Sequence, residues 1–204
     1  MLWHAVRAVC VPQVAKVFVV LAPDDARFAR EDWSAFEGRL ETLYCGGQTR
    51  RESVYNALVA ARDAWDTDDW VLVHDAARPC LASQDLEALL SECKTDAIGG
   101  LLALPVADTV KKAAKDESGT QRVLSTEDRS QLWLAQTPQM FRAGLLVQAL
   151  QRARGAVTDE ASAVEQMGLK PKLVAGSREN IKVTWPEDLA LAESILRRRP
   201  EVSR

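Results

Sequence analysis

The sequence contains few of the side chains that bind metals through nitrogen or sulfur. Its only histidines are His4 and His74, and its cysteines form no CxxC pair and have no histidine at metal-ligand spacing. This composition excludes the usual zinc sites. We interpret the cysteines as reduced cytosolic thiols; they are Cys10, Cys45, Cys80 and Cys93. No serine or cysteine is placed to form a nucleophilic triad with His74, so we interpret it as a structural histidine.

The chain also lacks an excess of charge and long apolar runs. Its formal net charge is −3, and residues of both signs are spread along the 204 positions. It has no basic face for a nucleic-acid backbone, so a bound phosphate must be held by a few placed cations. The longest apolar stretches are far shorter than the roughly 20 residues of a membrane helix, and no signal-peptide pattern opens the chain. We expect a cytoplasmic protein without nucleic-acid or membrane partners.

No internal repeat and no low-complexity linker divides the sequence. Its length and its 47% hydrophobic content suit one substantial core, so we expect a single domain over residues 1–204. Within it, residues 110–130 are polar, charged and weakly periodic, and apolar runs flank them. We expect this stretch to leave the domain body as an arm over about residues 107–132.

Short apolar runs alternate with longer helical patterns along the chain. The runs rich in β-branched residues predict strands buried on both faces, at residues 16–22, 70–75, 99–106 and 180–184. This alternation predicts an α/β fold with a mostly parallel sheet. Thr49 and Glu52 are spaced as a capping box at the start of one helix. Pro186 and Arg197 mark the two ends of a closing helix.

The run at 70–75 ends on His74-Asp75, and Arg78 and Pro79 follow it. In an open α/β sheet, ligands bind beyond the carboxyl ends of the strands, which is where Asp75 would lie. An aspartate there can hold Mg²⁺ against phosphate oxygens, and Arg78 can contact an anion. The alternative is a surface ion pair between Asp75 and Arg78, worth under about 1 kcal/mol.

Other polar residues stand where apolar runs end. Gly46 and Gly47 precede the capped helix, where backbone N–H groups can approach a ligand, and a plain turn is the alternative. Three threonines are either ligand contacts or simple caps; they are Thr109, Thr137 and Thr158. Lys182 is more informative, because a cation within a short apolar strand is costly unless it faces a partner or a ligand.

Longer motifs follow one another over nearly the whole chain; they are GGQTRRESVYNAL, VLVHDAARPCL, LPVADTVKK, LWLAQTPQMF, VTDEASAVEQMG and NIKVTWPEDLALAESIL. In order and spacing they resemble the 2-C-methyl-D-erythritol 4-phosphate cytidylyltransferase family of the non-mevalonate isoprenoid pathway. The resemblance implies a Rossmann-like domain with helices on both faces of its sheet, which binds CTP and Mg²⁺. It also implies that the phosphate of methylerythritol phosphate attacks the α-phosphorus of CTP, giving the CDP-linked alcohol and pyrophosphate.

The resemblance further implies roles for single residues. Asp75 would be a catalytic carboxylate that binds metal and substrate, and Lys182 would be a catalytic cation that offsets charge on the phosphates. The cytidine site would include Gly47, Gln48 and Ser53. The methylerythritol phosphate site would be lined by Arg78, Thr109, Arg129, Thr137 and Thr158. The arm at 107–132 would form a homodimer and bring Arg129 to the partner's active site.

The chain departs from the family pattern at its start. Family members open with a strand and a Gly-rich triphosphate loop of the form AAGxGxRM followed by PKQ, whereas MLWHAVRAV matches the first helix after that loop. We therefore expect an opening of about 30 residues, one strand-loop-helix unit, to be absent from residues 1–204. We also expect residues 1–204 by themselves to be impaired as an enzyme. A ribitol 5-phosphate cytidylyltransferase and a non-catalytic dimerising fragment are the alternative readings.

Overall fold

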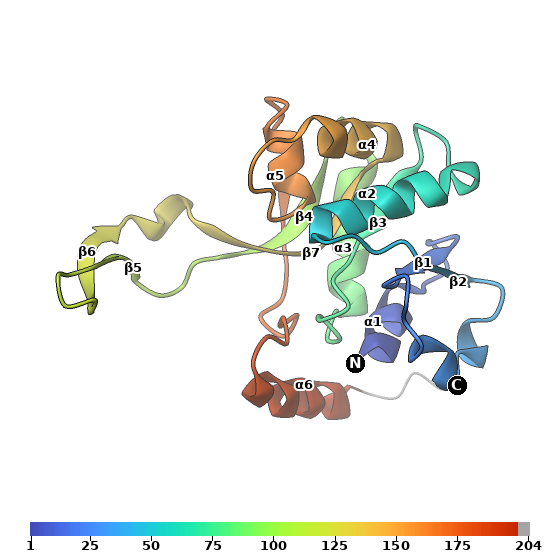
Figure 1. Ribbon diagram of the computed structural model, residues 1–204, viewed down its shortest axis with the longest axis horizontal. Helices are drawn as coiled ribbons and strands as arrows, with labels where there is room; N and C mark the ends of the chain where they lie inside the picture. Colours follow the sequence, from blue (N-terminus) through green and yellow to red (C-terminus); the bar gives the residue numbers. More distant parts are fainter. Residues whose placement is uncertain (200–204) are drawn as a thin grey trace.

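The strands and helices of the chain form an α/β structure with one long projection (Figure 1). The computed structural model describes residues 1–199, so residues 200–204 of the predicted domain lie outside the described part. The α-helices of the described part are α1 (Leu2–Val9), α2 (Arg50–Ala60), α3 (Ser83–Lys94), α4 (Ala143–Arg152), α5 (Glu160–Glu165) and α6 (Pro186–Arg198). The strands are β1 (Val17–Val20), β2 (Leu40–Leu43), β3 (Trp70–Val73), β4 (Gly99–Pro105), β5 (Val110–Lys115), β6 (Gln121–Glu127), β7 (Trp133–Arg142) and β8 (Lys172–Ala175).

The central sheet has the strand order β3-β7-β4-β8. β8 is parallel to β4, whereas β7 runs antiparallel to both of its neighbours, β3 and β4. β3, β4 and β8 therefore point the same way, and β7 is the reversed strand between them. A second, smaller sheet pairs β1 with β2 in parallel. The predicted α/β arrangement is present, and the reversed strand brings the end of β3 beside the middle of β7.

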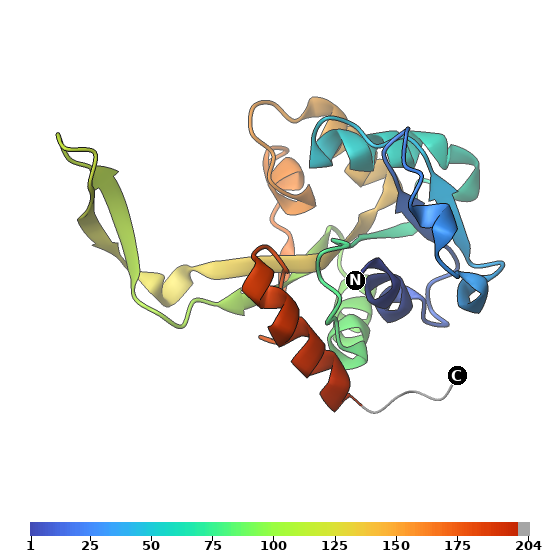
Figure 2. The same ribbon diagram turned by 60° about the horizontal axis from the view of Figure 1, so that its bottom comes forward.

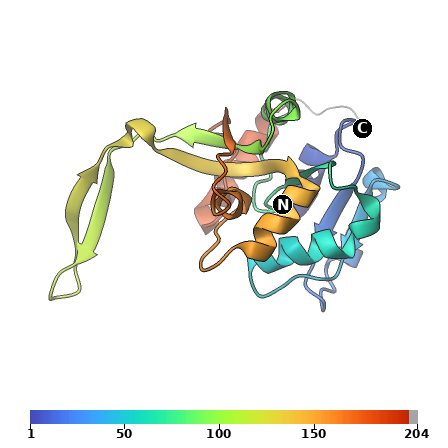
Figure 3. The ribbon, with the colours of Figure 1, turned by 90° about the horizontal axis from the view of Figure 1, so that it is seen from above.

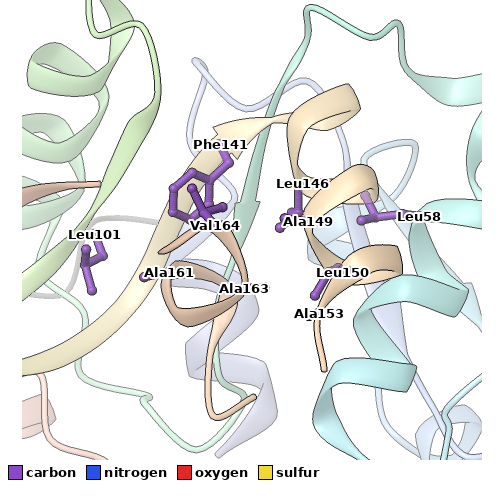
Figure 4. Packing of buried hydrophobic residues seen from close by; sticks show 10 residues of the cluster. All are labelled: Leu58, Leu101, Phe141, Leu146, Ala149, Leu150, Ala153, Ala161, Ala163 and Val164. Atoms are coloured by element: carbon purple, nitrogen blue, oxygen red, sulfur yellow. The ribbon is translucent and has the colours of Figure 1, made fainter. Parts of the chain in front are cut away.

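The side chains of successive residues in the sheet point to opposite faces and build two separate cores. On one face, Leu101 of β4 and Phe141 of β7 pack with α2, α4 and α5 (Figure 4). On the other face, Leu102, Met140 and Val174 pack with α3 and with the end of α1. Helices therefore cover both faces, as the sequence predicts. The carboxyl end of β3 is therefore held between the helices on one face of the sheet and those on the other.

The predicted strand at residues 180–184 is wrong. This segment runs beside the turn after β3, and among the described residues its backbone hydrogen bond to that turn goes from the Val183 amide to the Ala77 carbonyl, at 2.8 Å. β8, which no sequence pattern predicts, pairs with β4 at that edge of the sheet instead. Ile181 and Val183 pack beneath α6 rather than within a sheet, which explains why the segment is apolar without being a strand.

The capping patterns of the two predicted helices are present. The Thr49 hydroxyl accepts a hydrogen bond from the Glu52 amide, and the Glu52 carboxylate accepts one from the Thr49 amide, each at 3.1 Å. Pro186 opens α6, and Asp188 accepts hydrogen bonds from the amides of Thr184 and Trp185. No helix among residues 1–199 combines the length and the hydropathy needed to cross a bilayer.

The polar stretch predicted as an arm forms the antiparallel hairpin β5–β6, which extends far from the body in all three views (Figures 1, 2 and 3). The ends of β4 and β7 lead into it. Most of its residues are exposed, including the apolar Val123 and Leu124, which are 65% and 63% exposed. The hairpin therefore presents apolar surface that no described residue of its own chain covers.

Candidate active site

A cavity of about 190 Å³ lies at the carboxyl end of β3. Five residues singled out in the sequence line it; they are Asp75, Arg78, Thr137, Thr158 and Lys182. They come from segments far apart in the chain, namely the turn after β3, the middle of β7, the loop before α5 and the segment after β8. The remaining lining residues are Arg50, Ala135, Gln136, Gln139 and Asp159. The fold thus gathers these polar residues around one hollow.

Asp75 lies between two cations. Its Oδ1 accepts a hydrogen bond from Nε of Arg50 at 2.9 Å, and its Oδ2 lies 2.9 Å from the Lys182 ammonium. Burial raises the pKa of Asp75, but the hydrogen bonds and charges of Lys182 and Arg50 outweigh it and bring the pKa below its ordinary value. Asp75 is therefore ionised at neutral pH. The alternative pairing of Asp75 with Arg78 does not form.

Lys182 reaches the cavity because its neighbours point the other way. Ile181 and Val183 pack against Cys80 and α6, so the alternation along this extended segment turns the lysine side chain toward Asp75. The Lys182 side chain remains 48% exposed. The expectation that this cation faces a partner is confirmed, and its exposure leaves the ammonium accessible to an anion in the cavity.

Arg50 joins Asp75 to a second carboxylate. Its Nη1 and Nη2 donate to the two oxygens of Glu160 at 2.7 and 2.9 Å, while its Nε donates to Asp75. The Glu160 side chain is only 1% exposed. Burial disfavours the charge of Arg50, but the two carboxylates outweigh this effect and raise its pKa. Arg50 is thus a permanent cation that spans α2, the turn after β3 and α5.

A chain of hydrogen bonds fixes the turn that carries Asp75. The Asp75 amide donates to Oγ1 of Thr137 at 3.0 Å, and that oxygen lies 3.0 Å from Nδ1 of His74. Nε2 of His74 lies 3.1 Å from the Arg78 carbonyl. Burial lowers the pKa of His74 to about 4, so the ring is neutral at pH 7. Because the Arg78 carbonyl can only accept, Nε2 carries the single proton of the neutral ring and donates to it. Nδ1 is then an acceptor, and the Thr137 hydroxyl donates to it.

Arg78 also lines the cavity and belongs to the same turn as Asp75. Its Nη1 donates to the carbonyl of the fully buried Asn180 at 2.6 Å, and Nη2 makes a longer contact of 3.4 Å to the Ala135 carbonyl. Its Nε is buried and has no hydrogen-bond partner among the described residues. Burial lowers the pKa of Arg78, and no carboxylate forms an ion pair with it in the described part of the chain. Its charge is therefore less compensated than that of Arg50.

The Gly-Gly turn lies at the start of α2. The Gly47 amide donates to Oγ of Ser53 at 3.0 Å, and a Cβ at position 47 would meet Cβ of Glu52 at 2.4 Å. Glycine is therefore required here by the close approach of the first turn of the helix. The structure brings Gly47 and Ser53 together, with Gln48 exposed beside them. These residues lie outside the lining of the 190 Å³ cavity.

Thr109 and Arg129 lie at the base of the arm and do not line the cavity of their own chain. Both are exposed, and Nη1 of Arg129 donates to the Ala107 carbonyl. The structure thus separates these two residues from the other predicted contacts to the sugar phosphate. Their position agrees with an arm that carries them away from the body.

Comparison with known proteins identifies the family of the chain. The family model for 2-C-methyl-D-erythritol 4-phosphate cytidylyltransferase matches residues 1–198. The chain belongs to this family. A relative of that name from Dechloromonas aromatica is 56% identical over 200 residues, which are 98% of this chain and 86% of the relative. One from Thiobacillus denitrificans is 55% identical over 185 residues, which are 91% of this chain and 79% of the relative.

Solved structures of the family have the same fold. A crystal structure of 4-diphosphocytidyl-2C-methyl-D-erythritol synthase is 42% identical, with a TM-score of 0.85, over 96% of this chain and 89% of that one. The 2-C-methyl-D-erythritol 4-phosphate cytidylyltransferase of Francisella tularensis is 35% identical, with a TM-score of 0.78, over 95% of this chain and 87% of that one. The Rossmann-like α/β fold predicted from the sequence is confirmed.

Family membership raises the question of whether Asp75 suits a magnesium ion. Among the described residues, no group of three His, Cys, Asp or Glu side chains is placed to hold a metal. Mg²⁺, however, usually keeps several waters and binds one or two carboxylates together with substrate phosphates. A single ionised carboxylate beside cations that attract phosphate therefore fits this ion. The residue that would hold it is Asp75.

Sequence reasoning missed several residues of the site, above all Arg50 and Glu160. Each stands in the first turn of a helix, where a charged residue is usually solvated. Gln136 and Gln139 were not singled out because they stand within the apolar run of β7. Both are buried and hydrogen-bonded. TDEASAVE itself carries no signal for this role, because a buried glutamate requires a cationic partner but the burial of Glu160 follows only from the structure.

Proposed function

We propose that this protein transfers CMP from CTP to 2-C-methyl-D-erythritol 4-phosphate, releasing pyrophosphate. The observation that supports this most directly is the cavity in which Arg50, Arg78 and Lys182 surround Asp75, in a chain of this family. In the reaction, an oxygen of the sugar phosphate attacks the α-phosphorus of CTP. A new P–O bond forms there, and the bond from the α-phosphorus to the bridging oxygen breaks as pyrophosphate leaves.

The residues of the cavity suit the charge changes of this step. Negative charge is spread over the oxygens of the α-phosphorus in the transition state, and cations positioned in advance stabilise it without reorganisation. Lys182 is accessible, and its one ion pair within residues 1–199 is with Asp75, so it is the cation assigned to those oxygens. Arg78, whose Nε has no partner among the described residues, is assigned to the phosphate of the sugar.

We assign the nucleotide to the start of α2 and the alcohol to the side of the cavity formed by β7 and the loop before α5. Gly47, Gln48 and Ser53 would contact the cytidine, with the Gly47 backbone close to the ligand because no Cβ intervenes. Thr158 lies at the cavity and would contact the sugar. The hydroxyl of Thr137 is already engaged by Asp75 and His74, so it acts by holding the turn.

Mg²⁺ is the cofactor that we propose. Bound at Asp75 together with substrate phosphates, it would neutralise phosphate charge and help to orient the reacting groups. Lys182 and Arg50 keep Asp75 ionised, which is the form that binds a cation.

We further propose that the protein is a cytoplasmic homodimer whose arms are exchanged. The exposed Val123 and Leu124 on the hairpin are side chains that a second subunit would cover. Thr109 and Arg129 would then complete the partner's sugar-phosphate site rather than their own.

Turnover with defined substrates tests this function. Purified protein is incubated with CTP, Mg²⁺ and methylerythritol phosphate, and the CDP-linked alcohol and pyrophosphate are quantified. Residues 1–204 are compared with a chain extended at its start by the strand and Gly-rich triphosphate loop that open family members, because that loop is not part of residues 1–204. Ribitol 5-phosphate serves as the matched alternative acceptor. We expect product from methylerythritol phosphate in the extended chain; product from ribitol 5-phosphate alone, or none in either chain, would contradict the proposal.

A further inference from the structure

We infer that Arg50 is a positioning residue, which orients the Asp75 carboxylate by anchoring its own guanidinium on the buried Glu160. This inference rests on the proposed function, because it gives Arg50 a part in the same site. Nothing in the family motifs quoted from the sequence assigns a role to Arg50 or to Glu160.

The geometry of the guanidinium carries the argument. An arginine offers a rigid, planar set of donors, and here one edge of the plane is bound by both oxygens of Glu160. The Nε–H that remains points at Oδ1 of Asp75 at 2.9 Å. Because Glu160 is 1% exposed and fixed in the first turn of α5, the plane of the guanidinium cannot rotate freely. Arg50 therefore transmits the fixed position of Glu160 to Asp75.

Asp75 needs such an anchor. Its other ionic partner, Lys182, is a flexible side chain that is 48% exposed, and a single ammonium does not define the plane of a carboxylate. With Oδ1 held by Arg50, Oδ2 is directed to Lys182 and toward the cavity. Without Arg50, the carboxylate would be free to turn about its last side-chain bond. Its oxygens would then no longer face the reacting phosphates in one orientation.

The buried ion pair between Arg50 and Glu160 also affects the stability of the fold. The experiment must separate this effect from an effect on catalysis. Removing Arg50 alone leaves an unpaired buried carboxylate, which destabilises a protein for reasons unrelated to catalysis. Replacing both partners by apolar residues of similar size is often neutral for stability. The double variant Arg50→Met/Glu160→Leu therefore removes the anchor of Asp75 without leaving an unpaired buried carboxylate, since Glu160 is gone and Asp75 keeps its pairing with Lys182.

The test compares Arg50→Met, Arg50→Met/Glu160→Leu and Arg50→Lys in the turnover assay and in urea unfolding. We expect Arg50→Met to lower the urea midpoint and the double variant to recover it. We expect kcat of the double variant to stay about 10²-fold below wild type, with a smaller change in KM, as for a misplaced catalytic group. Arg50→Lys keeps the charge but replaces the planar set of donors by one ammonium, which does not fix the plane of the Asp75 carboxylate, so its kcat should stay low as well. Recovery of kcat in the double variant or in Arg50→Lys would overturn the inference.

Arg51 provides the matched control. It is the next residue of α2, and its Nε and Nη2 donate to the Leu150 carbonyl at 3.1 and 2.8 Å, away from the cavity lining. Arg51→Met should leave kcat unchanged. A loss of kcat in Arg51→Met as large as in the Arg50 variants would mean that any change in α2 impairs turnover, and the inference would fail.

A crystal structure of Arg50→Met/Glu160→Leu separates this inference from the proposed function, since it needs no substrate. We expect the Asp75 carboxylate to adopt another orientation or several. If the Asp75 carboxylate of the variant keeps the single orientation that it has in the wild type, the inference is overturned even if the wild type is active. A wild type that forms no product would instead overturn the proposed function.

Discussion

The Lys182 ammonium lies 2.9 Å from Oδ2 of Asp75, although the two residues belong to segments on opposite sides of the arm in the sequence. One comes from the turn after β3 and the other from the extended segment before α6. The Val183 amide donates to the Ala77 carbonyl, and the Arg78 side chain donates to the Asn180 carbonyl, so hydrogen bonds hold these segments side by side. These contacts place a partly exposed cation and an ionised carboxylate at one cavity.

Replacing Lys182 by alanine should lower turnover by more than about tenfold, because a cation facing the phosphates in a partly desolvated site stabilises their charge. Steady-state kinetics with CTP and methylerythritol phosphate measure the effect. Lys172→Ala is the control, since Lys172 is a partly exposed lysine that contacts Glu92, and neither residue lines the cavity. Equal kinetics in wild type and Lys182→Ala would remove Lys182 from the mechanism.

Mixing Arg129→Ala chains with Lys182→Ala chains should restore activity if active sites are shared between subunits. Random exchange makes about half of the dimers mixed, and each mixed dimer has one site with both residues intact. We therefore expect about a quarter of the wild-type rate. Subunit exchange is verified by native mass spectrometry. Exchange without any recovery of activity would show that Arg129 does not act across the interface.

Thr137→Val should destabilise the protein by about 1–3 kcal/mol, because the Asp75 amide and His74 each lose a partner in a partly buried place. Thr137→Ser retains the hydroxyl and is the control. The free energy of unfolding of each variant is measured in urea. If Thr137→Val lowers the free energy of unfolding no more than Thr137→Ser does, the methyl group of Thr137 matters for stability and its hydrogen bonds do not.

The buried cysteines should be unreactive until the chain unfolds. Cys80 and Cys93 are both 0% exposed, and burial raises the pKa of Cys93 to about 11, so little thiolate forms at pH 8. Cys10 and Cys45 are partly exposed and should be modified first. Labelling with a disulfide reagent followed by mass spectrometry measures the order. Modification of Cys93 as fast as that of Cys10 in the folded protein would contradict the packing of α3 against the sheet.

The part of the site predicted from the sequence is the part that depends on local pattern. Asp75 and Arg78 follow an apolar run, and the end of such a run marks the ligand-binding edge of an α/β sheet. Lys182 stands out because its neighbours are apolar, and its pairing with a carboxylate follows from the cost of leaving it unpaired. The capping box at Thr49 and Glu52 likewise involves residues within one turn.

The missed features depend on partners distant in the sequence. Glu160 looks like a solvated residue in the first turn of a helix, and only the packing of α5 over the sheet buries it against Arg50. β8 has only four residues, too few for a clear sequence pattern, and it is recognised as a strand by its pairing with β4. The segment at 180–184 resembles a strand because Ile181 and Val183 are apolar, yet their burial comes from α6.

Oxygen isotope tracing determines whether the phosphate of the sugar attacks the α-phosphorus of CTP. Methylerythritol phosphate with ¹⁸O in its non-bridging phosphate positions is incubated with unlabelled CTP and the chain extended by the Gly-rich triphosphate loop of family members. Phosphorus NMR then locates the label. We expect ¹⁸O in the bridge between the two phosphorus atoms of the CDP-linked product and none in pyrophosphate. Label in pyrophosphate, or a product whose cytidine-linked phosphorus carries no ¹⁸O, would contradict attack by the sugar phosphate.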